Sequence, residues 1–250
     1  MALVNVLITL GAPFVLLYRT AAAVRRTGLA LKECAVQFVE LGTRSSWLVG
    51  GGLAFLGAVM VNIAWAQARK YTGNIVVVGP AYFELMIREF CPLTAAILCA
   101  SRAGAGTSAE LAAMSVNEQV EALELSAADP HAELVAPRLV ASALAVPLLT
   151  VVGIVTASLS AYATVRFVYA ADGLAFIDPR FVDLGDVSCC FLKSILCGLF
   201  IPLAASRRGL MAKGGAHAVG GAVTDGVVDA AMGCLLIDFT VTAAFFLVGI

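Results

Sequence analysis

The chain has 250 residues, of which 61% are hydrophobic and only 13% are charged, and its formal net charge is −1. Ordinary soluble domains are roughly 45–50% apolar and about 25% charged. This composition leaves too little polar surface for a soluble fold, so it predicts an integral membrane protein. No basic, aromatic-rich surface indicates nucleic-acid binding. Seven cysteines without a C-x-x-C pair, and only two histidines, make a metal site unexpected.

The N-terminal segment is apolar at residues 2–17, just short of the roughly 20 residues that a spanning helix needs. Its positive charges, Arg19, Arg25 and Arg26, follow the apolar run. A cleavable signal peptide has them in front of it, so we expect no signal peptide here. We interpret residues 1–45 as interfacial helices on the cytoplasmic surface. The alternative is a short transmembrane span at residues 2–17.

Five later apolar stretches predict spanning helices, at residues 47–67, 80–103, 139–162, 187–205 and from 223 to the C-terminus. The first is rich in glycine, which either permits close helix packing in lipid or merely faces the lipid. We find no repeat and no low-complexity linker. The prediction is an all-α membrane protein with a single domain, residues 1–250, in which 46–250 form the transmembrane core.

A polar, acidic segment separates the second and third expected spans. Ser108 is a candidate N-cap, and Glu110 follows it near the positive end of the helix dipole. Three further acidic residues recur every third position and would share one helix face: Glu118, Glu121 and Glu124. The pattern predicts one surface helix over residues 108–127.

The basic residues are unevenly distributed between the two sides of the membrane that these spans define. Most lie in the N-terminal segment and in the loops expected at residues 102–138 and 206–222. By the positive-inside rule these segments are cytoplasmic. The N-terminus is then cytoplasmic, the C-terminus lies on the opposite side, and the acidic helix lies in the cytoplasm.

Four ionisable residues fall inside the expected spans: Arg88, Glu89, Lys193 and Asp238. A charge at the bilayer centre costs about 2.5–3.5 kcal/mol even on the lenient insertion scale, so such groups face a cavity or one another. All four lie at a similar depth in the outer half of the bilayer, and their formal charges cancel. They form either a polar patch that holds a lipid headgroup through Arg88 and Lys193, or inter-helix ion pairs that touch no substrate. Adjacent Arg88 and Glu89 point about 100° apart on a helix, so we do not expect both to face one spot.

Five motifs, in order, resemble those of the MlaE/YrbE permease family over about residues 45–250. The motifs are MIREFCP at 86–92, SRAGAGTSAEL at 101–111, MSVNEQVEALEL at 114–125, the pair DP at 129–130 with APR at 136–138, and a later block that includes KS at 193–194, RGL at 208–210, GGA at 214–216, AVT at 222–224 and IDF at 237–239. Cys91 and Ser101 depart from the glycines expected there.

The resemblance implies the permease subunit of an ABC transporter, not an enzyme. It would move phospholipids between the inner and outer membranes and so maintain outer-membrane lipid asymmetry. The implied assembly is a homodimer in the bacterial inner membrane, with a lipid cavity at its two-fold axis that opens outward to the periplasm, where the C-terminus also lies. ABC ATPase subunits would bind below, a hexameric MCE-domain protein above, and a STAS-domain subunit in some species.

The resemblance also implies roles for individual residues. The substrate-binding residues would be Arg88, Glu89, Phe90, Lys193 and Asp238. The acidic helix would be a coupling helix that docks on the ATPase, through Arg102, Glu110, Glu118, Glu121 and Glu124.

The chain has no G-x-x-x-x-G-K-[ST] phosphate loop. We therefore expect no cofactor in this chain, with ATP and Mg²⁺ held by the partner ATPase. Two alternatives remain open at this point: a permease of the same fold for sterols or other hydrophobic compounds, and a membrane enzyme acting on lipids.

Overall fold

The computed structural model describes residues 2–71 and 73–248, without the side chains of residues 2–10, 12 and 181, and every regular element in these ranges is a helix. Four helices are long and apolar enough to cross a membrane: α2 (Leu31–Tyr71), α7 (Ala136–Phe167, with the π-turn η4, His131–Val135, before it), α9 (Leu184–Leu210) and α10 (Ala216–Val248). The chain is therefore an all-helical, multi-pass membrane protein, as its composition predicts.

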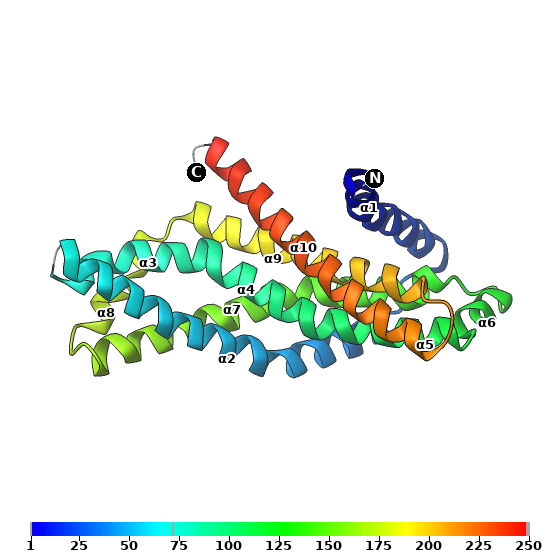
Figure 1. Cartoon of the computed structure of the whole chain (residues 1–250), viewed down its shortest axis with the longest axis horizontal. Helices are drawn as coiled ribbons and strands as arrows, with labels where there is room; N and C mark the ends of the chain where they lie inside the picture. Colours follow the sequence, from blue (N-terminus) through cyan, green and yellow to red (C-terminus); the bar gives the residue numbers. More distant parts are fainter. Residues whose placement is uncertain (1, 72, 249–250) are drawn as a thin grey trace.

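The second expected span is a segmented helix. Five contiguous pieces follow one another from residue 79 to residue 116: α3 (Gly79–Leu85), the π-turn η2 (Met86–Phe90), α4 (Cys91–Cys99), the π-turn η3 (Ala100–Gly104) and α5 (Ala105–Val116). Together they extend along the long axis of the molecule beside α2 and α7 (Figure 1). Four of the five expected spans thus fall on single long helices, and the second expected span, residues 80–103, falls on this segmented run. Such π-turns occur frequently at functional sites.

The N-terminal boundary differs from the prediction. α2 begins at Leu31, so residues 31–45, which we assigned to the interface, are continuous with the first span. The separate helix α1 (Ala2–Thr27) precedes it, and Leu16 of α1 packs against Val135 and Leu203. Whether residues 2–17 cross the membrane or lie on it stays a prediction.

The acidic segment is two helices, so the prediction of one helix over residues 108–127 is wrong. α5 ends at Val116, and α6 (Gln119–Leu125) begins after Glu118, whose backbone is left-handed with a φ of 59°. Ser108 does not cap a helix, because α5 continues from η3. Its buried hydroxyl instead donates a hydrogen bond to the Ala205 carbonyl of α9 at 3.2 Å.

Close helix contacts depend on particular glycines. A Cβ atom at Gly57 of α2 would lie 2.6 Å from the Ala157 carbonyl oxygen of α7, whereas one at Gly51 would meet nothing. Backbone approach of this kind is how helices associate in lipid, where packing drives association. The glycines of the first span were expected either to permit close helix packing or merely to face the lipid. At Gly57 the structure shows close packing.

The two ends of the bundle differ in their connections. One end carries the short elements η1 (Ile75–Val78), α8 (Gly173–Phe176) and η5 (Pro179–Phe181), and the other carries α6 (Figure 1). The long helices alternate in direction between these ends, and α10 crosses the others obliquely (Figure 1). The loop expected at residues 206–222 is shorter than predicted, because α9 extends to Leu210 and α10 begins at Ala216.

Candidate functional site

The ionic cluster

Lys193 of α9 lies at the centre of a buried ionic cluster. Its side chain is 1% exposed, and its Nζ lies 2.6 Å from Glu89 Oε2 and 3.0 Å from Asp238 Oδ1. The same ammonium donates a hydrogen bond to the backbone carbonyl of Arg88 at 3.1 Å. Two of the three N–H donors of the ammonium therefore form hydrogen bonds, to Glu89 and to the Arg88 carbonyl. The contact with Asp238 is an ion pair, and Asp238 Oδ1 has no hydrogen-bond partner among the residues that the structure describes. Lys193 therefore joins the π-turn η2, α9 and α10 at one point.

Arg88 extends the cluster to a residue that the sequence analysis missed. Its Nη1 lies 3.1 Å from Oδ1 of Asp186, which is 5% exposed. Asp186 also closes the capping box at the start of α9 by accepting a hydrogen bond from the backbone N–H of Asp183 at 3.1 Å. The sequence analysis did not single out Asp186, which directly precedes the span expected at residues 187–205. The available signal was the spacing of Asp183 and Asp186, which is typical of a capped helix start.

Thr242 of α10 is the second member that was missed. Its hydroxyl lies 3.1 Å from each carboxylate oxygen of Glu89 and 2.9 Å from the Asp238 carbonyl oxygen. A hydroxyl has one proton to donate, so it bonds Glu89 or the Asp238 carbonyl at a given moment. The cluster therefore has a hydrogen bond that can change partner without moving a helix.

The charges of the cluster do not cancel once Asp186 is included. When every group is ionised, three carboxylates face two cations, and the cluster carries one excess negative charge. The shortest ion pairs of Arg88 and Glu89 are to different partners, Asp186 and Lys193. Arg88 Nε also lies 3.8 Å from Glu89 Oε1, so the two adjacent side chains belong to one network. Their side chains are 18% and 24% exposed, so these two are more accessible from outside than Lys193. Phe90, the next residue, is half-buried against the main core.

The coupling residues

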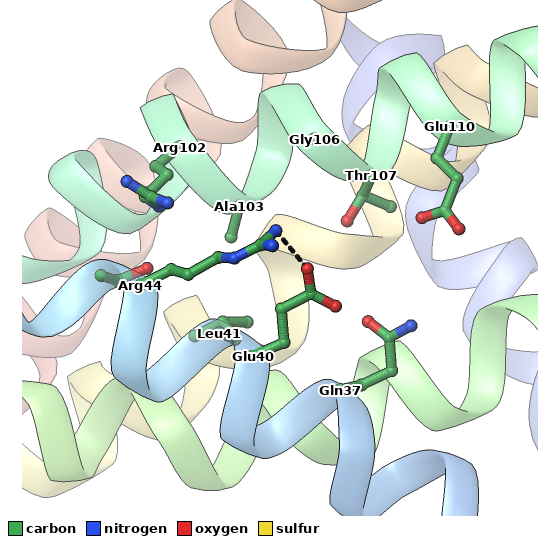
Figure 2. Close-up of a pocket in the computed structure, with 10 residues that line it drawn as sticks. Gln37, Glu40, Leu41, Arg44, Arg102, Ala103, Gly106, Thr107 and Glu110 are labelled. Atoms are coloured by element: carbon green, nitrogen blue, oxygen red, sulfur yellow. Dashed lines mark hydrogen bonds and ion pairs between the residues drawn. The ribbon is translucent and has the colours of Figure 1, made fainter.

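The residues expected to contact the ATPase divide into two groups. Glu118, Glu121 and Glu124 are exposed on and beside α6, at one end of the bundle. Glu110 instead forms an ion pair across to α7, with its Oε2 2.8 Å from Nη2 of the buried Arg138. Glu110 and Arg102 both line a cavity between α5, η3 and α2 (Figure 2).

A second ionic group joins α9 to α10 near the end that carries α6. Arg208 Nε lies 2.6 Å from Asp229 Oδ2, and Arg208 Nη1 lies 3.0 Å from Asp225 Oδ2. These two helices are thus connected by ion pairs at two levels, one at Lys193 and one at Arg208.

Comparison with known proteins

Buried ion pairs between long apolar helices define the class of the protein, a multi-pass membrane protein with a polar centre. The chain belongs to the MlaE permease family, because the model of that family, permease MlaE, matches residues 34–244. It is a transport permease subunit rather than a membrane enzyme acting on lipids, and the family implies ABC transporter partners such as an ATPase.

Similar proteins carry matching descriptions. A "Probable ABC transporter permease protein" of Synechocystis sp. is 30% identical over 187 residues, which cover 74% of this chain and 71% of that protein. A protein of Rickettsia typhi with the same description is 28% identical over 212 residues, which cover 84% of this chain and 82% of that protein. The chloroplastic protein trigalactosyldiacylglycerol 1 of Arabidopsis thaliana is 32% identical over 201 residues, or 78% of this chain and 57% of that protein.

Proposed function

We propose that this permease moves phospholipids between the inner and outer membranes of a bacterium and so maintains outer-membrane lipid asymmetry. The observation that carries the proposal is the ionic cluster around Lys193, whose outer members Arg88 and Glu89 are partly accessible while its centre is closed. A lipid cargo is also supported by the Arabidopsis relative, whose name is that of a galactolipid.

The cluster suggests a division of roles among its residues. Arg88 is the accessible cation, so it would bind the headgroup phosphate, partly replacing its pairing with Asp186. Glu89 would accept hydrogen bonds from headgroup amines or hydroxyls. Lys193 and Asp238 would hold Glu89 in place, because Lys193 is only 1% exposed. Phe90 would contact the acyl chains.

The assembly that fits this role is a homodimer in the inner membrane, with the lipid in an outward-opening cavity between the two copies. In this proposal the N-terminus is cytoplasmic and the C-terminus is periplasmic. The exposed glutamates of α6 contact an ATPase that holds ATP and Mg²⁺, while Arg102 and Glu110 transmit its motion. A hexameric MCE-domain protein covers the periplasmic side, and a STAS-domain subunit is a further candidate partner.

The experiment compares lipid binding by the wild-type chain with that by Arg88→Gln. Each is purified from its own membranes in mild detergent, and phospholipid is counted per protomer. Losing one charge-assisted contact should reduce bound phospholipid roughly tenfold. Arg69→Gln, at an exposed arginine of α2, is the matched control and should bind as the wild type does. Equal phospholipid on Arg88→Gln would contradict the proposal, and enrichment of sterol in place of phospholipid would favour the sterol permease instead.

A further inference from the structure

A polar groove lies between α2 and the run from η3 to α5, away from the ionic cluster. Its cavity volume is about 320 Å³. Figure 2 shows Arg102 and Arg44 reaching from opposite walls, with Thr107 and Glu110 on the α5 side. We call it the α2–α5 groove, and it is lined by Gln37, Glu40, Leu41, Arg44, Ser45, Arg102, Ala103, Gly106, Thr107 and Glu110.

The groove has an inner recess with an unsatisfied hydroxyl. A second, smaller cavity shares Gln37 and Thr107 with the groove and extends to Ser142 of α7. Ser142 is 1% exposed, and its Oγ has no hydrogen-bond partner among the residues that the structure describes. Buried hydroxyls are nearly always hydrogen-bonded, so an unpaired one beside a cavity indicates that a ligand or a ligand-bound water completes the site.

The charges of the groove favour an anion. Arg44 pairs with Glu40, and Arg138, which lines the recess, pairs with Glu110 at 2.8 Å. Arg102 is exposed and forms no ion pair with any carboxylate in the described part of the chain. Three arginines against two glutamates leave one positive charge over, on a guanidinium whose planar fork suits a phosphate.

An exposed tryptophan next to the groove is consistent with the level of lipid headgroups. Trp47, three residues after Arg44 on α2, is 88% exposed, and exposed tryptophans are enriched at the membrane–water interface. Beyond Trp47, Leu48 and Phe55 continue an exposed apolar surface along α2. Arg44 thus lies within one turn of an exposed tryptophan and of an exposed apolar surface that could hold acyl chains, and Val36 and Val39 are exposed on the other side of Arg44.

We propose that the α2–α5 groove binds the phosphodiester headgroup of a phospholipid in the leaflet at the α6 end of the bundle. Arg102 binds the phosphate, Arg44 joins it by leaving Glu40, and the acyl chains lie along Leu48 and Phe55. The inference rests on the proposed function only in assigning this leaflet to the cytoplasmic side. It adds a headgroup site that differs from the ionic cluster in its helices and in its depth.

The test is photolabelling of the full chain in phosphatidylcholine nanodiscs that contain a phosphatidylglycerol with a diazirine on its headgroup. Trypsin then releases the peptide of residues 33–44, between Lys32 and Arg44, which carries the α2 wall of the groove. Arg102→Gln leaves both cleavage sites of this peptide intact. Labelling of residues 33–44 should fall roughly tenfold in Arg102→Gln and remain unchanged in Arg69→Gln.

Two further arms identify the source of the phosphate and separate this site from the ionic cluster. A diacylglycerol probe with the same diazirine but no phosphate should label residues 33–44 equally in the wild type and in Arg102→Gln. Arg88→Gln should leave phosphatidylglycerol labelling of residues 33–44 unchanged, because Arg88 does not line the groove. A failure of the proposed function at the cluster would then be distinguished from a failure at the groove. Undiminished labelling in Arg102→Gln would overturn the proposal, and so would loss of labelling in excess inorganic phosphate, which would assign the groove to the free ion.

Discussion

The two ionic connections between α9 and α10 differ in burial and in the number of elements that they join. The Lys193–Asp238 pair, at 3.0 Å, has side chains that are 1% and 14% exposed, and it also involves Glu89 of η2. The Arg208–Asp229 pair, at 2.6 Å, is 30% and 15% exposed and joins only the two helices. Removing one partner of a buried pair leaves an uncompensated charge, whereas an accessible charge can be solvated. The connection at Lys193 should therefore be the costlier one to break.

Lys193→Ala should have the largest effect on stability. It leaves the carboxylates of Glu89 and Asp238 facing each other without their cation, which should cost about 3–5 kcal/mol of unfolding free energy. Thermal unfolding of the purified chain in detergent measures the loss. Adding Glu89→Gln to Lys193→Ala should recover part of the stability, because it removes one of the uncompensated charges. If Lys193→Ala unfolds at the same temperature as the wild type, the cluster does not stabilise the fold.

Asp229→Asn should have an intermediate effect. It removes the charge that Arg208 and Arg207 share, at 2.6 and 3.9 Å, and should cost about 1–2 kcal/mol. Salt screens accessible charges, so the loss of unfolding free energy in Asp229→Asn should shrink in 1 M salt. The loss in Lys193→Ala should not shrink, because that cluster is more buried. The control is Asp225→Asn at a side chain that is 58% exposed, with an expected loss of about 0–1 kcal/mol. Equal losses for the two aspartates would contradict the assigned geometry.

The sequence predicted the members of the deep cluster better than its full extent. Arg88, Glu89, Lys193 and Asp238 could be identified because charges are rare inside apolar spans. Asp186 could not, because it lies in the first turn of α9, just before the expected span, where carboxylates are ordinary. Such a residue is assigned to the cluster only when the helix packing is known.

The helix boundaries show a similar division. Length and composition predicted the long helices, but the π-turns η2 and η3 depend on backbone hydrogen bonds that have no residue signature. The break between α5 and α6 falls at Glu118, whose left-handed backbone is unusual outside glycine and asparagine. The periodic glutamates begin at this break, and no glycine or proline marks it between residues 108 and 127, so the sequence predicted one helix where two exist.

Thr242→Val should have the smallest effect on stability. It tests how much the hydrogen bond of the Thr242 hydroxyl contributes to the unfolding free energy. It keeps the shape of the side chain but removes the hydroxyl that lies 3.1 Å from Glu89 and 2.9 Å from the Asp238 carbonyl oxygen. The expected cost is about 0.5–1.5 kcal/mol, the usual net contribution of one hydrogen bond. Thr242→Ser keeps the hydroxyl and should restore most of that stability in the same unfolding experiment. A Thr242→Val chain with the same unfolding free energy as the wild type would show that the hydroxyl adds nothing to stability, and α10 would then stabilise the cluster through Asp238 and not through Thr242.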